Sequence, residues 1–170
     1  MQTALYRGDA DAAWRLLTEE ESKLRRSMLT RVQAFRIEST YLRARCALAM
    51  TSANRSPRRF LSVARAGARR IAAEQMPWSD PIALLLRAGI ASLEGRDTAA
   101  LTCLHAAADG FDRAGMQLYG AVTRRRIGPL RGDDHGRELQ RQAEAWMAAQ
   151  QIKNPVCMTR MLAPGFADRV

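Results

Sequence analysis

The sequence is poor in aromatic residues and long apolar runs, and each shortage excludes a class of protein. Aromatic residues make up 6% of the 170 residues, while alanine and leucine dominate the apolar 47%, a balance that favours helix over strand. The apolar runs are far shorter than the roughly 18 residues needed to cross a bilayer. Three cysteines without regular spacing indicate a reducing compartment, and acidic residues from Asp9 onward interrupt any signal peptide. We therefore expect a helical, cytoplasmic protein.

The sequence also lacks the patterns that predict catalysis or cofactor binding. It contains neither a G-x-G-x-x-G nor a G-x-x-x-x-G-K-[ST] phosphate loop. Cys103 and His105 are two residues apart on a predicted helix, so their side chains point in different directions, and His135 lies in a predicted loop. We expect no enzymatic activity from this segment, no cofactor and no metal site.

The positive charge of the chain is concentrated in one segment. The formal net charge is +10, and residues 22–72 contain 13 basic residues and one acid, Glu38, which gives that segment +12 and leaves −2 for the rest. Almost all the basic residues are arginine, since lysine occurs only at Lys23 and Lys153. Arginine has the planar fork of donors that matches carboxylates and phosphates. This segment is the candidate binding region.

Seven arginines are the candidate partner-binding residues. In the helix predicted after Pro57, Arg58, Arg65 and Arg69 fall on one side, opposite an apolar stripe that begins with Phe60. We expect Phe60 to lie in the core, together with Phe35. Arg124–Arg126 is a second, smaller cluster. The candidates are Arg31, Arg36, Arg43, Arg45, Arg58, Arg65 and Arg69.

Three interpretations of these arginines stay open. They can form an ordinary solvated helical face, a site for an acidic peptide or domain, or a site for nucleic acid. Aromatic residues for base stacking are scarce in the segment, which argues against nucleic acid.

A short pattern that predicts a helical hairpin occurs twice. After Gly8 and again after Gly95, an alanine follows five residues later, then a large apolar residue, then a leucine. Glycine tolerates the left-handed turn that ends one helix, and Asp9 or Asp97 can cap the next one. Stacked hairpins of this kind present a binding surface rather than a reaction centre.

The remaining pattern predicts seven or eight helices and no strand. Apolar residues recur with a period near 3.6 almost everywhere, and Arg126 is a polar intrusion in one such stripe. A break at Met76–Pro81, with Asp80 as cap and Pro81 at the first helical position, divides the chain. We expect one all-α domain of antiparallel helical hairpins with three parts: a basic half (1–75), a second half (76–150) and a tail (151–170).

Small and apolar residues recur at fixed positions in part of the second half, namely Ala88, Gly95, Ala100, Leu104 and Ala107. With these positions the segment resembles a tetratricopeptide repeat, which implies a right-handed stack of hairpins. The basic half does not follow the 34-residue period of that family.

A second resemblance covers most of the chain. It is carried by Leu5–Asp9, Ala13–Trp14, Arg43–Ala49, Trp146–Pro155, Met158, Met161 and Ala163–Phe166. With these segments the sequence looks like the C-terminal end of large bacterial serine/threonine protein kinases with tetratricopeptide-like repeats, in which an N-terminal kinase domain precedes a sensing or recruiting tail. None of the kinase motifs occurs here, so kinase activity is not transferred to these residues.

Together these observations predict a non-catalytic protein-interaction or sensor module of a bacterial signalling protein. Residues Thr3–Arg7 look like the last turn of a helix, so we expect a fragment of a longer protein, or a domain that docks or forms a homo-oligomer through this end. The expected partner is an acidic peptide or domain, such as a tethered kinase domain. The alternative is a nucleic-acid-binding helical domain that uses residues 22–72.

Overall fold

The computed structural model describes residues 1–26, 31–53 and 57–167, excluding the side chains of 22–25. Within this part, the chain forms nine α-helices and no strand, which confirms the all-α prediction. The number exceeds the expected seven or eight because short helices form near both ends of the sequence, at Gln2–Arg7 and Pro155–Leu162. The helices are α1 (Gln2–Arg7), α2 (Ala10–Arg26), α3 (Gln33–Ser52), α4 (Pro57–Ala73), α5 (Asp80–Leu93), α6 (Asp97–Arg113), α7 (Gln117–Arg131), α8 (Asp134–Ala149) and α9 (Pro155–Leu162).

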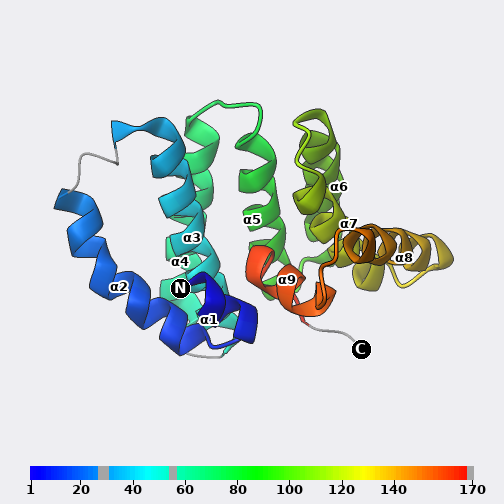
Figure 1. Ribbon diagram of the computed structural model, residues 1–170, viewed down its shortest axis with the longest axis horizontal. Coiled ribbons are helices and arrows are strands. Elements are labelled where there is room, and N and C mark those ends of the chain that lie inside the picture. Colours follow the sequence, from blue (N-terminus) through cyan, green and yellow to red (C-terminus); the bar gives the residue numbers. More distant parts are fainter. Residues whose placement is uncertain (27–30, 54–56, 168–170) are drawn as a thin grey trace.

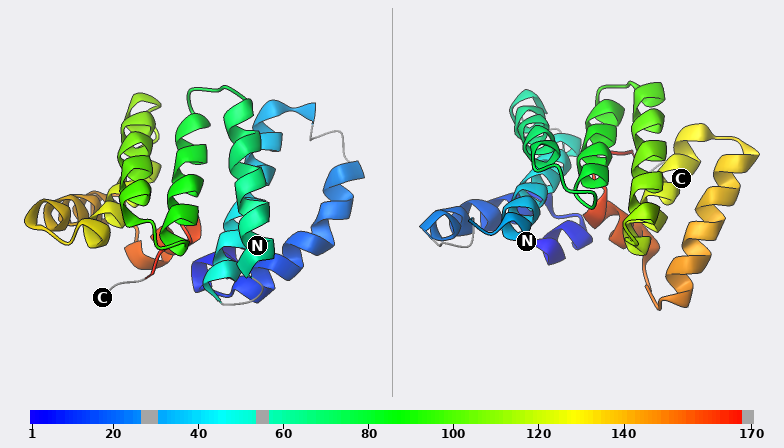
Figure 2. Two further views of the ribbon diagram at one scale, coloured as in Figure 1. Left: turned by 180° about the vertical axis from the view of Figure 1, so that it is seen from behind. Right: turned by 90° about the horizontal axis from the view of Figure 1, so that it is seen from above.

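The helices pack as antiparallel hairpins. Each helix from α1 to α8 contacts the next one along the chain, and α3 also contacts α5. The last helix breaks this order, since α9 returns to pack against α1 and α7. Figure 1 shows α9 in front of the stack beside α1, and α4 behind α3. In the left view of Figure 2, which is seen from behind, α4 is nearest to the viewer. The two faces of the stack therefore differ in what covers them.

The two predicted hairpin turns are present, but their caps differ. Gly8 and Gly95 adopt φ values of +80° and +71°, and the backbone N–H after each bonds back into the preceding helix. Asp9 caps α2 by accepting a hydrogen bond from the Ala12 N–H at 2.9 Å. The prediction that Asp97 also caps its helix is wrong. Because Arg96 stands between Gly95 and Asp97, the aspartate comes one position too late and lies in the first turn of α6.

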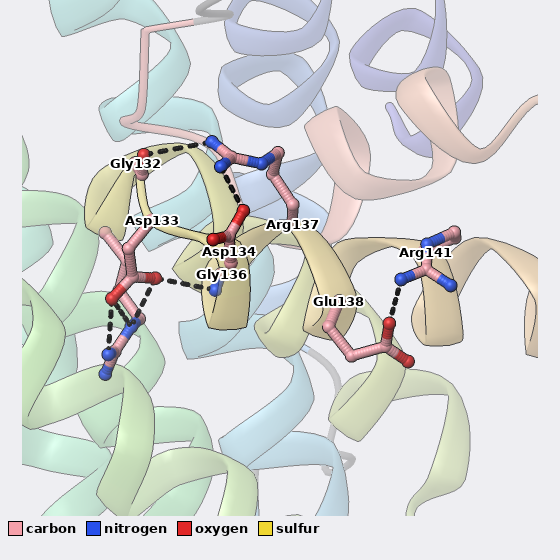
Figure 3. Close-up of polar contacts among 8 residues, drawn as sticks. Gly132, Asp133, Asp134, Gly136, Arg137, Glu138 and Arg141 are labelled. Atoms are coloured by element: carbon pink, nitrogen blue, oxygen red, sulfur yellow. Dashed lines mark hydrogen bonds and ion pairs between the residues drawn. The ribbon is translucent and has the colours of Figure 1, made fainter.

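The break before α5 shows the same one-residue shift. The residue at the cap position is Ser79, and the predicted cap Asp80 is already in the first turn, followed by Pro81. At the start of α8, by contrast, Asp133 caps the helix through a hydrogen bond from the Gly136 N–H at 2.7 Å (Figure 3). An aspartate caps a helix only where the backbone leaves the helical conformation at that residue.

The core runs through the middle of the stack and follows most of the predicted apolar stripes. Phe60 is buried, and Trp14 from α2 packs edge-on against its ring at 4.9 Å between centroids. The prediction that Phe35 belongs to the core is wrong, because this side chain is 52% exposed. In α3 the inward positions are Ile37 and Tyr41, and a residue two places before Ile37 lies about 200° away around the helix.

The N-terminal hairpin does not present the exposed apolar face that its short first helix suggests. Leu5 of α1 is buried in a small cluster with Ala13, Leu17 and Cys46, and α9 packs against the same helix. Among the described residues, no helix is both long and apolar enough to cross a lipid bilayer.

Candidate protein-binding surface

Helix α4 separates apolar and basic residues onto opposite sides. Its buried positions are Phe60, Ala64, Gly67, Ala68 and Ile71, and Gly67 is required for close packing because an added Cβ would lie 2.9 Å from the Cβ of Ala44 on α3. The helix has no acidic residue, and five arginines occupy its other side: Arg58, Arg59, Arg65, Arg69 and Arg70. All five are exposed. This basic side of α4 is named the α4 surface below.

Most of the α4 surface has no acidic partner. Arg65 forms an ion pair with Glu94, which also pairs with Arg96. Burial acts to raise the pKa of Glu94, but the hydrogen bonds from Arg96 and Arg65 outweigh it and the pKa is lowered. The other four arginines form no ion pair with any residue that the structure describes. Since α4 also contains no acid, this surface is a local concentration of uncompensated positive charge.

Two further candidates are tied to neighbouring acids. Arg36 binds Glu74 through two contacts, Nε to Oε1 at 2.5 Å and Nη2 to Oε2 at 2.6 Å, and Gln33 donates to the same carboxylate at 3.1 Å. The hydrogen bond from Arg36 is the main cause that lowers the pKa of Glu74. Arg43 pairs with Glu21, and its guanidinium lies 5.7 Å from the centroid of the Trp14 ring. These two arginines link helices within the fold.

The structure corrects the interpretation of Arg45 as a surface residue. Its side chain is 1% exposed, and its guanidinium lies 4.4 Å from the centroid of the Tyr41 ring. Its Nη1 donates to the backbone carbonyl of Met161 at 3.1 Å. The reason is the return of the C-terminal residues over α3, which buries a face that the sequence pattern leaves open. Arg31, in contrast, is exposed just before α3.

The smaller cluster Arg124–Arg126 does not form a continuous basic patch. Arg124 pairs with Asp112 of α6, and the Arg125 Nε lies 2.9 Å from Oε1 of Glu144 on α8. Arg126 points into the fold, is 6% exposed, and donates from Nε to the Ala163 carbonyl at 3.0 Å. Consecutive residues of a helix point in different directions, so each of the three finds a different neighbour.

The arginines around the start of α8 provide a contrast with the α4 surface. Figure 3 shows Arg137 beside Asp134 and Arg141 beside Glu138, both ion pairs within one helix. The Nη2 of Arg131 lies 2.6 Å from Asp133 Oδ2. The hydrogen bond from Arg131 is the main cause that holds the pKa of Asp133 well below its ordinary value, and the Gly136 N–H adds to it. These three arginines therefore have acidic partners within the fold, unlike most of those on the α4 surface.

The sequence interpretation missed a set of buried contacts on the opposite face. Tyr41 and Arg45 of α3 and Arg126 of α7 all donate to backbone carbonyls near the end of the chain. Burial raises the pKa of the Tyr41 hydroxyl, with the Arg45 charge acting in the other direction, so the phenol remains a donor. One feature of the sequence pointed to these contacts. Arg126 lies in an apolar stripe, and a charged side chain at a buried position needs a hydrogen-bond partner.

Within the described part of the chain, no group of three or more His, Cys, Asp and Glu side chains is placed to hold a metal ion. Comparison with known proteins found no match to a protein-family model, a curated protein or a solved structure.

Proposed function

We propose that this chain is a non-catalytic protein-interaction module of a bacterial signalling protein, and that the α4 surface binds an acidic peptide or domain. The observation that carries the proposal is the unpaired charge of α4, where four exposed arginines lie together on one helix without an acidic neighbour among the described residues, whereas Arg131, Arg137 and Arg141 each pair with an acid. Unpaired guanidinium groups on a rigid helix supply a complementary potential and bidentate donors for carboxylates.

The geometry of α4 favours a protein partner over nucleic acid. Its aromatic residue, Phe60, is 5% exposed and packs inward, so it offers no ring on which a base can stack. Arg58, Arg65 and Arg69 recur at helical spacing on one side, which suits a line of carboxylates on an extended or helical acidic segment. Duplex nucleic acid remains the alternative, since it needs only phosphate contacts.

The test compares charge reversal on α4 with an equal reversal elsewhere. Binding of a fluorescein-labelled oligoglutamate peptide and of a duplex DNA is measured by fluorescence anisotropy at several salt concentrations. The variant Arg58→Glu/Arg65→Glu/Arg69→Glu is expected to weaken oligoglutamate binding by at least about tenfold, because the local potential changes sign. The matched control, with the same change in net charge at the end of α7 and on α8, is Arg131→Glu/Arg137→Glu/Arg141→Glu.

The outcomes separate the two candidate functions. Preferential loss of oligoglutamate binding in the α4 variant supports the acidic-protein site. Tighter binding to DNA than to oligoglutamate, with an association constant whose logarithm falls steeply and linearly with the logarithm of the salt concentration, contradicts the acidic-protein site and supports the nucleic-acid function. Equal losses in the α4 variant and the control overturn a localised site on α4.

The wider context proposed for the module is a cytoplasmic serine/threonine kinase with this region at its C-terminus. The support is the sequence resemblance in the N-terminal hairpin, the Arg43–Ala49 segment and the tail. An antibody against this chain, used on an extract of the native cells, tests the proposal by mass. A polypeptide much larger than 18.9 kDa that carries kinase motifs is expected, and a native product of 18.9 kDa contradicts the kinase context.

A further inference from the structure

Three consecutive backbone carbonyls near the end of the chain are each held by a different buried side chain. Arg45 Nη1 donates to the Met161 carbonyl at 3.1 Å, and Tyr41 Oη donates to the Leu162 carbonyl at 2.6 Å. The Ala163 carbonyl accepts from Arg126 Nε at 3.0 Å. The donors come from α3 and α7, which are far from residues 161–163 in sequence. The three contacts recognise the main chain and not the side chains of the segment.

The residues that follow fit closely against α5. Gly165 has a φ of +95°, and an added Cβ there would lie 3.0 Å from the Gly89 carbonyl oxygen. A Cβ on Gly89 would in turn lie 2.7 Å from the Pro164 carbonyl oxygen. Phe166 is 8% exposed, and the Arg126 guanidinium lies 5.1 Å from its ring centroid. The fit therefore depends on Gly89 of α5, and on Gly165 and Phe166 of the residues that pack against it.

Residues 155–167, named the C-terminal segment here, thus lie on one face of the stack, the inner face. In this segment α9 packs against α1 and α7, and residues 161–166 contact α3, α5 and α7. Figure 1 shows α9 of this segment crossing in front of the stack, on the side away from α4. The segment does not fill the face completely. A cavity of about 250 Å³ remains beside it, lined in part by Gly8, Ala53, Arg126 and Phe166.

We propose that the inner face is a peptide-binding site and that the C-terminal segment occupies it in cis. The ligand class is a peptide whose last helical turn exposes three successive carbonyls and continues into a Pro-Gly-aromatic sequence, as residues 161–166 do. A partner peptide of this class binds when the segment leaves, so the segment acts as an internal competitor. This site is independent of the α4 surface, because the two lie on opposite faces.

The main experiment weakens the segment in the full chain and offers the same segment in trans. Gly165→Ala places a side chain at a positive φ and against the Gly89 backbone, so it disfavours docking of the segment. The probe is a fluorescein-labelled peptide of residues 155–167 with the natural sequence. We expect it to bind the Gly165→Ala protein at least tenfold more tightly than the unaltered protein, in which an intramolecular segment at high effective concentration competes.

Two controls test whether the binding is specific. Gly115→Ala also alters a glycine with positive φ, +68°, but nothing lies within 4 Å of the added Cβ, so it is expected to leave peptide binding at the unaltered level. A probe peptide that itself carries Gly165→Ala is expected not to bind. Equal binding of both peptides, or no binding of the natural peptide to the folded Gly165→Ala protein, overturns the proposal.

Hydrogen exchange of the unaltered protein tests the same proposal without a variant. Amides of residues 159–163 are expected to exchange at least 100-fold faster than core amides of α5 and α6, because the segment opens while the stack stays folded. If the amides of residues 159–163 and the core amides exchange at the same rate, the proposal is overturned. Unfolding of the Gly165→Ala protein also overturns it, because the segment is then a part of the core. The α4 variant is expected to bind the peptide as the unaltered protein does, which separates failure of this site from failure of the α4 surface.

Discussion

Removing one oxygen atom tests how much the buried contact between Tyr41 and Leu162 contributes to stability. Tyr41→Phe deletes the hydroxyl that donates to the Leu162 carbonyl at 2.6 Å and keeps the ring. Both the tyrosine (0% exposed) and Leu162 (6% exposed) are buried, so water cannot easily replace the lost donor. Leaving a buried carbonyl without a partner costs about 1–3 kcal/mol. We expect the free energy of unfolding to fall by about 2 kcal/mol.

Urea unfolding followed by circular dichroism measures this change, and thermal unfolding gives a second estimate. For a protein of this length, about 2 kcal/mol corresponds to a decrease in Tm of about 4–8 °C. Amides of residues 159–163 are expected to lose protection as well, since the contact that fixes their backbone is gone.

Tyr119→Phe is the matched control. The Tyr119 ring lies 6.2 Å from the Tyr41 ring between centroids, and its hydroxyl forms no hydrogen bond with any residue that the structure describes. The same chemical change is therefore expected to alter the free energy of unfolding by less than about 0.5 kcal/mol. Equal effects of the two substitutions would refute the argument that Tyr41 stabilises the protein through Leu162.

Two further predictions concern titration and thiol reactivity. Arg36 lowers the pKa of Glu74 in the folded state. The pair therefore stabilises the protein fully at pH values above the pKa of Glu74 in the unfolded chain, about 4.3. This stability is lost as the pH falls through the lower pKa of the folded state. Glu74→Gln is expected to lower Tm at pH 7 and to make its decline from about pH 5 to pH 3 shallower, and parallel curves would contradict this. Burial raises the pKa of Cys46 to about 11, so a disulfide reagent at pH 8 is expected to modify the partly exposed Cys103 and Cys157 first and Cys46 only after urea unfolding. Mass spectrometry of the early product checks this, and rapid modification of Cys46 would contradict it.

Features that depend on residues close in sequence could be predicted well. The helices follow from the period of apolar residues, and the turn at Gly95 follows from a glycine that tolerates positive φ. The two sides of α4 follow from the spacing of Arg58, Arg65 and Arg69 opposite Phe60. Cap positions depend on the exact residue at which a helix begins, and a single intervening residue moved Asp97 into the helix. The basic segment is covered only in part, because residues 27–30 and 54–56 lie outside the described residues.

The sequence by itself determined an all-α chain with a basic helix face, because a helix and its two sides are set by residues three and four places apart. It could not distinguish Arg45 from Arg69, since both are arginines in predicted helices. Only the tertiary structure decided that Arg45 is buried and Arg69 exposed, because residues 161–163, more than a hundred positions later, pack over α3 and leave α4 uncovered. The environment of a side chain depends on contacts between distant segments, and those contacts exist only when the chain is folded.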